Sequence, residues 1–76
     1  MPGMKEKVIK ILNEFTYNPV DATDKLSDIG LDSLDMIDVV MEIEMELGVI
    51  MSDEQAEEFF ANKTVQDLID FVEKEA

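Results

Sequence analysis

The segment from residue 33 to residue 47 carries apolar residues on two opposite sides of a predicted helix. At about 100° per residue, one stripe consists of Leu34, Ile37, Met41 and Met45. The opposite stripe consists of Met36, Val40, Ile43 and Leu47, with Val39 at its edge. A small helical domain buries only one of the two stripes, so the other is predicted to be an exposed docking surface.

The same kind of pattern predicts three further helices. The first covers about residues 4–15, where Val8, Ile11, Leu12 and Phe15 recur at helical spacing. A short third helix runs from a Ser-x-x-Gln capping box at Ser52 to about residue 60, and a fourth begins at Thr64 after the break at residues 62–63. No segment has a convincing strand pattern. The predicted fold is therefore all-α, an irregular four-helix bundle in a single domain over residues 1–76.

A long connector, about residues 16–31, is predicted between the first two helices. Its apolar residues, expected to turn toward the core, are Val20, Leu26, Ile29 and Leu31. Gly30 allows a tight turn before the second helix, which begins at Asp32 or Ser33, and Gly48 is well placed to cap its C-terminus.

The net charge of the chain limits the classes of molecule that it can bind. Nineteen acidic residues against six lysines give a net charge of −13, which repels nucleic acid and anionic membranes and favours basic protein surfaces. The same charge also keeps a small protein soluble. The chain has no apolar run of transmembrane length and no signal peptide, so we expect a cytoplasmic monomer without nucleic-acid or stable membrane partners.

The composition leaves few chemical sites. Because the chain has no His, Cys or Arg, serine triads, cysteine dyads, arginine clamps and zinc sites with nitrogen or sulfur ligands are excluded. A paired-carboxylate glycosidase needs a sugar cleft that so small a domain can hardly form. An EF-hand loop needs an oxygen ligand five residues before its Gly, and Lys25 and Ile43 stand at those positions before Gly30 and Gly48. We therefore predict a protein that is not an enzyme and has no metal site.

Ser33 is the residue with the most distinctive surroundings. In isolation, Asp32 or Ser33 could simply cap the helix, because both residue types are preferred there. Ser33 also lies at the end of the exposed stripe, and a helix N-terminus favours an attached phosphate. An acidic flank borders the stripe: Asp35, Asp38, Glu42 and Glu46. A serine in this setting is suited to accept a phosphate-linked group from another protein's active site.

The segment from Asp28 to Asp35, Asp-Ile-Gly-Leu-Asp-Ser-Leu-Asp, resembles the prosthetic-group attachment motif of acyl carrier proteins. The resemblance extends over nearly the whole chain. It includes Glu-Leu-Gly at the end of the second helix, Ser-Asp-Glu-Gln-Ala-Glu at the start of the third, and Thr-Val-Gln-Asp before the last. Motif, length, charge and helix order agree with that family.

The resemblance implies that a phosphopantetheinyl transferase attaches 4′-phosphopantetheine from coenzyme A covalently to Ser33, with Mg²⁺. The thiol of this arm would carry acyl groups as thioesters to acyl-transferring, condensing and reducing enzymes with basic docking surfaces, in fatty-acid or related biosynthesis. The implied recognition residues are Asp32, Leu34, Asp35, Ile37, Asp38, Met41, Glu42 and Glu44. In that family longer acyl chains fold back between the helices. The residues that could line such a pocket, or simply form the core, are Val40, Ile43, Leu47, Leu68 and Ile69.

Three departures from the common fatty-acid carriers bear on the pocket and the pathway. The connector is shorter by a few residues, the region of residues 60–62 is longer, and Met36 and Met45 add bulk to the second helix. Two alternatives stay open. One is a specialised carrier, such as a polyketide or D-alanyl carrier, which the Asp32-Ser33-Leu34 pattern permits; the other is an unmodified acidic interaction module.

Overall fold

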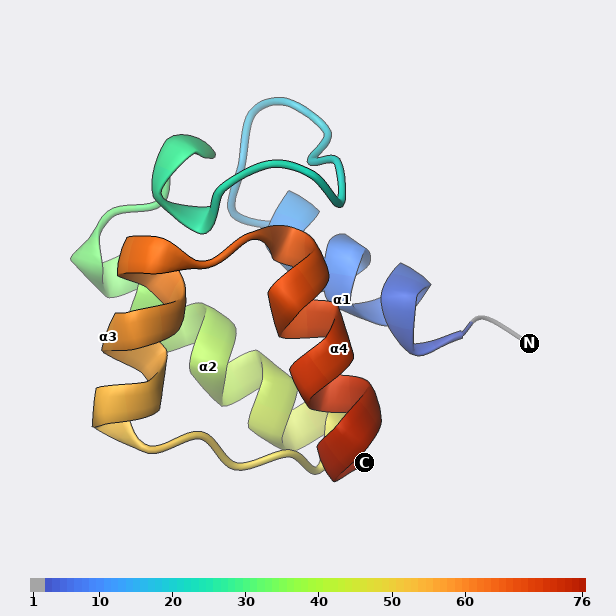
Figure 1. Ribbon diagram of the computed structural model, residues 1–76. Coiled ribbons are helices and arrows are strands. Elements are labelled where there is room, and N and C mark those ends of the chain that lie inside the picture. Colours follow the sequence, from blue (N-terminus) through green and yellow to red (C-terminus); the bar gives the residue numbers. More distant parts are fainter. Residues whose placement is uncertain (1–2) are drawn as a thin grey trace.

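Four amphipathic helices enclose one core in the computed structural model, which describes residues 3–76 (Figure 1). They are α1 (Met4–Asn13), α2 (Ser33–Leu47), α3 (Asp53–Asn62) and α4 (Val65–Glu75). α1 packs against α4 and α2, and α3 packs against α2. The predicted all-α bundle is therefore confirmed. Residues 1–2 of the expected 1–76 domain lie outside the described residues.

Every helix and the connector contribute apolar side chains to the core. Among the described residues no polar or charged side chain is buried. The fully buried members, each stabilising the fold by about 1.5–3 kcal/mol relative to its exposed state, include Val8, Ile11, Leu12, Leu26, Val39, Ile43, Leu68, Ile69 and Val72.

Side-chain caps begin α3 and α4 where the sequence predicts. The Gln55 amide donates a hydrogen bond to Ser52 Oγ at 3.1 Å, and the Asp67 amide donates one to Thr64 Oγ1 at 3.1 Å. The Thr64 amide in turn donates to the Asp67 carboxylate at 3.0 Å, which lowers the pKa of that carboxyl. These caps satisfy backbone donors that have no partner inside the helix.

Two helices end at different residues from those predicted. α1 ends at Asn13 rather than near Phe15, because Asn13 Oδ1 accepts a hydrogen bond from the Val20 amide at 2.9 Å and the chain turns into the connector. Phe15 still packs against the core from outside the helix. α3 continues past residue 60 to Asn62, whose side-chain amide donates to Glu58 Oε2 at 3.0 Å. The break between α3 and α4 therefore begins at Lys63 rather than at Asn62.

The connector lies against the junction of α3 and α4. It contains a 3₁₀ turn, η1 (Leu26–Asp28), that the sequence pattern does not predict. Leu26 is buried and Ile29 and Leu31 are half-buried, so the connector does turn its apolar residues inward. Three backbone hydrogen bonds hold it there: Leu26 amide to Lys63 carbonyl (3.0 Å), Val65 amide to Asp24 carbonyl (2.8 Å) and Gln66 amide to Ala22 carbonyl (2.8 Å). The connector thereby fixes where α3 ends and α4 begins.

Within the described residues no helix combines the length and apolar character that crossing a bilayer requires.

Candidate functional site

Ser33 is the first residue of α2, and its side chain is exposed. The cap of this helix is Asp32, whose Oδ1 accepts a hydrogen bond from the Asp35 amide at 2.8 Å. The Asp32 amide donates back to the Asp35 carboxylate at 3.2 Å. These two reciprocal hydrogen bonds form a capping box. Gly30, with φ of 87°, supplies the turn that leads into it, as predicted. Of the two residues that the sequence offers as the cap, the structure therefore uses Asp32.

The Ser33 hydroxyl is left without a structural task. Among residues 3–76, no hydrogen bond of the structure uses Ser33 Oγ. The N-terminus of a helix carries about half a positive charge, so this position favours an anionic phosphate. The chain has no His or Cys that could act as a neighbouring base or nucleophile. The geometry therefore suits a serine that accepts a group from another protein.

The apolar stripe of α2 is exposed along its length. Its side chains have exposed fractions of 72% for Leu34, 57% for Ile37, 53% for Met41 and 76% for Met45. The stripe on the opposite side is buried at Val39 and Ile43. The prediction that the bundle covers only one side of this helix is confirmed. Ile50 lies beyond the C-terminal end of α2 and is 74% exposed. The helix ends at Gly48, whose φ is 70°, so the helical spacing that identifies the residues of the exposed stripe does not extend to Ile50.

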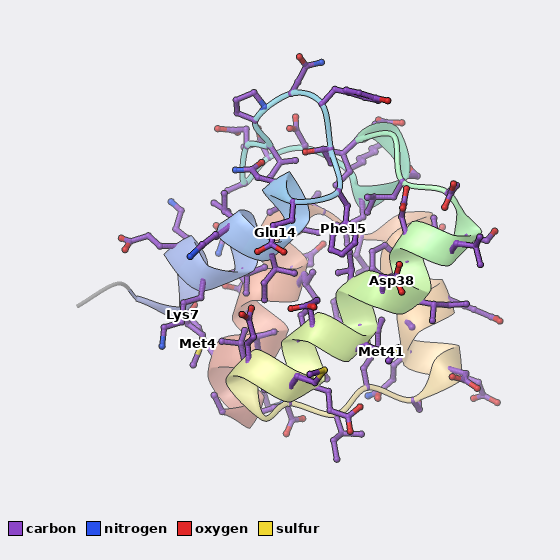
Figure 2. The ribbon with its side chains drawn as sticks, turned by 180° about the vertical axis from the view of Figure 1, so that it is seen from behind. Met4, Lys7, Glu14, Phe15, Asp38 and Met41 are labelled. Atoms are coloured by element: carbon purple, nitrogen blue, oxygen red, sulfur yellow. The ribbon has the colours of Figure 1, made fainter. Side chains whose placement is uncertain are left out.

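Carboxylates border the apolar stripe, and α2 contains no basic residue. Asp38 and Glu44 are exposed, and Asp35 and Glu42 are half-buried. Figure 2 shows Asp38 and Met41 on α2, well apart from Lys7 on α1. Because exposed like charges produce a field that extends over about 8–10 Å at ordinary salt, this face of the molecule attracts basic surfaces.

A groove of about 580 Å³ lies between α2 and α3 and reaches Ser33. Its lining consists of Ser33, Met36, Ile37, Val40, Met41, Glu44, Met51, Asp53, Ala56, Glu57 and Phe60. Of the residues that the sequence predicts for an acyl pocket, Val40 lines this groove. Ile43, Leu68 and Ile69 are buried in the core, and Leu47 borders a second hollow of about 450 Å³ between α1 and α2.

Sequence reasoning missed the contribution of α3 to the groove. Met51, Ala56 and Phe60 line it from that side. On α2, the residue that could have indicated the groove is Met36, which belongs to the inner stripe, lies one turn after Ser33 and is half-buried. In the part of the chain that the structure describes, no three acidic side chains come together as a metal-binding group.

Comparisons with known proteins agree on one family. The family model described as "Phosphopantetheine attachment site" matches residues 6–72. Acyl carrier proteins from two strains of Buchnera aphidicola subsp. Acyrthosiphon pisum, Tuc7 and APS, are each 35% identical over 81 positions, which cover 97% of this chain and 94% of the relative. An acyl carrier protein from Thermosynechococcus vestitus is 47% identical over 45 positions, which cover 59% of this chain and 52% of the relative.

Proposed function

Since the chain belongs to the acyl carrier protein family, we propose that Ser33 bears its 4′-phosphopantetheine and that the protein carries acyl groups in fatty-acid biosynthesis. Proteins of this family are carriers rather than catalysts, and their cofactor is phosphopantetheine. The single observation that carries the assignment is that Ser33 is an exposed residue at the start of α2 whose hydroxyl makes no hydrogen bond among the described residues.

The residues around Ser33 fit such a group. The phosphate would meet the positive end of α2, and the Asp32 cap holds the helix start in place without using the serine. The group supplies a terminal thiol on which acyl chains travel as thioesters, so the absence of Cys from the chain is no obstacle. The protein itself positions the serine, presents a docking face and shelters part of the cargo.

The groove favours an alkyl cargo over a charged one. Its floor is apolar at Met36, Val40 and Phe60, and its carboxylates, at Glu44, Asp53 and Glu57, belong to exposed residues. An alkyl chain gains about 0.8 kcal/mol for each buried methylene before ordering costs, whereas burying the ammonium of a D-alanyl group has a large desolvation cost. The groove therefore supports a fatty-acid carrier more than a D-alanyl carrier.

The first test is attachment itself. The full chain in its apo form is incubated with coenzyme A, Mg²⁺ and a phosphopantetheinyl transferase, and its intact mass is measured. We expect a gain of one phosphopantetheine and no more. An unchanged mass under conditions that modify a known carrier would contradict the proposal and favour an unmodified interaction module.

Docking depends on the face of α2 in this proposal. Replacing Asp35, Asp38 and Glu42 by Asn or Gln is expected to slow association with a basic partner enzyme on the order of tenfold at low salt, because charges at the molecular surface act mainly on the encounter rate. Ile37→Ala should instead speed dissociation and leave the salt dependence unchanged. Stopped-flow measurements at several ionic strengths separate the two effects.

A matched control removes the same charge elsewhere. The triple variant Asp70→Asn, Glu73→Gln and Glu75→Gln changes three exposed carboxylates of α4. It should slow association much less than the α2 variant. Equal slowing by both variants would show that net charge alone governs the encounter and that α2 is not the docking face.

A further inference from the structure

Met36 lies one helical turn beyond Ser33 on the same side of α2. Three residues advance a helix by about 4.5 Å, and side chains at this spacing are neighbours on the helix surface. Met36 is half-buried: it packs against the core and also lines the groove that reaches Ser33. Ile37, the next residue, also lines the groove, but it is largely exposed, so Met36 is the neighbour of Ser33 that a chain meets on its way toward the core.

Phe60 belongs to the same end of the groove. α3 crosses α2 obliquely in Figure 1, and the C-terminal end of α3 lies near the N-terminal end of α2. Phe60 is 3% exposed and belongs to the core, so its ring has little freedom to move. Met51, in contrast, precedes α3 and lines the groove from its opposite end. Ile37 also lines the groove near Ser33, but it is branched at Cβ and stiff at χ1, so Met36 is the flexible large side chain at this end of the groove.

We propose that Met36 sets the width of the groove beside Ser33, so that the groove admits an unbranched alkyl chain and excludes a wide group of equal carbon number. This inference rests on the proposed function, because it names the class of cargo that the carrier shelters. The residue acts on specificity and takes no part in any reaction.

The chemistry of the side chain accounts for the selection. Methionine is unbranched, has three rotatable bonds and fills irregular gaps by changing rotamer. A linear chain passes such a side chain after a rotamer change alone. A wide cage-like group would have to displace Phe60 or the α2 backbone, and forcing extra volume into a packed region is destabilising. Width rather than hydrophobicity therefore decides which group enters.

The test attaches a chain at position 33 without any enzyme. Because the chain contains no Cys, Ser33→Cys carries a unique thiol. The thiolate attacks an alkyl methanethiosulfonate, forms a disulfide to the alkyl group and releases methanesulfinate. Decyl and adamantyl groups both contain ten carbons but differ in width. The readout is the melting temperature of each alkylated protein minus that of its own unmodified form.

In the Ser33→Cys background, we expect the decyl group to raise the melting temperature by at least about 4 °C and the adamantyl group to raise it by less than half as much. Adding Met36→Phe should remove most of the decyl increment, whereas Met36→Ala should let the adamantyl group match the decyl group. Met36→Leu, of similar size, should keep the wild-type order. Met45→Phe, on the exposed stripe of the same helix, should leave both increments unchanged.

The melting increments test the role of Met36 separately from the general stability of each variant and from the proposed function. Because every increment is taken against the same variant without its alkyl group, a general loss of stability does not alter it. An undiminished decyl increment in Met36→Phe, or equal decyl and adamantyl increments with Met36 intact, would overturn the inference. The enzyme-free attachment keeps this test separate from the proposed function: failure of the transferase to modify Ser33 contradicts the carrier role and leaves these increments measurable.

Discussion

Replacing Ser33 by alanine is expected to abolish phosphopantetheine attachment completely and to leave the melting temperature nearly unchanged. The hydroxyl is the atom that would receive the phosphate, so its loss removes the acceptor. The structure gives α2 its cap through Asp32, so Ser33→Ala removes no cap. Alanine also has a higher helix propensity than serine. Intact mass after the transferase reaction and a thermal melt of the same sample measure both halves of this result.

Asp32→Ala is the matched control, because it removes the cap and keeps the hydroxyl. We expect it to cost about 1 kcal/mol and to lower the melting temperature by about 4–8 °C; because Asp32 is also one of the implied recognition residues, attachment is expected to be slower than in the wild type but still to occur at Ser33. Two other serines, Ser27 and Ser52, are also exposed. A mass gain that persists in Ser33→Ala and maps to either of them would refute the assignment.

Leu26→Ala is expected to be among the most destabilising single substitutions in the chain. Leu26 is fully buried in η1, a turn that packs against α3. Truncating a buried leucine to alanine typically costs about 2–5 kcal/mol, which corresponds to about 10–30 °C in a domain of this size. The total stability of such a small domain is only of the order of 5–15 kcal/mol. Urea and thermal unfolding followed by circular dichroism would measure the loss.

Ser27→Ala provides the comparison, since it changes the exposed neighbour in the same turn. It should shift the melting temperature by only a degree or two. A loss below about 1 kcal/mol for Leu26→Ala would mean that the connector detaches without disturbing the core, and that the α3–α4 junction does not depend on it.

Local chemistry made most of the fold predictable. The caps at Ser52 and Thr64 and the positive φ of Gly30 and Gly48 are properties of a few neighbouring residues. The predicted end of α1 was wrong because the observed end depends on the hydrogen bond from the Val20 amide to the Asn13 side chain, and these two residues are seven positions apart. The turn η1 was not predicted, and the backbone bonds that hold the connector join segments about 40 residues apart. No periodic pattern in the sequence reports such pairings.

In the candidate site, too, features of a single helix were predictable from the sequence, and features that depend on the packing of two helices were not. The exposed stripe follows from periodicity on one helix, so its residues were identified correctly as exposed. The groove needs the position of α3 relative to α2, which the pattern of either helix alone does not fix. Of the five residues expected in an acyl pocket, Val40 lines the groove, Leu47 borders the second hollow, and Ile43, Leu68 and Ile69 are buried in the core. An inward direction on a helix shows that a side chain is covered, but not whether a cavity adjoins it.

Ile37 and Met41 belong both to the exposed stripe and to the lining of the groove. In the proposed carrier, an alkyl chain in the groove and a partner on the stripe would share these two side chains, so a change that one makes in their position would alter the free energy of binding the other. Such a coupling is reciprocal by thermodynamic necessity. If a guest holds these side chains in the position that a partner needs, both bind more tightly together; if it draws them away, each weakens the other by the same factor. A partner of the proposed carrier would then bind the protein with different affinities when the groove is filled and when it is empty.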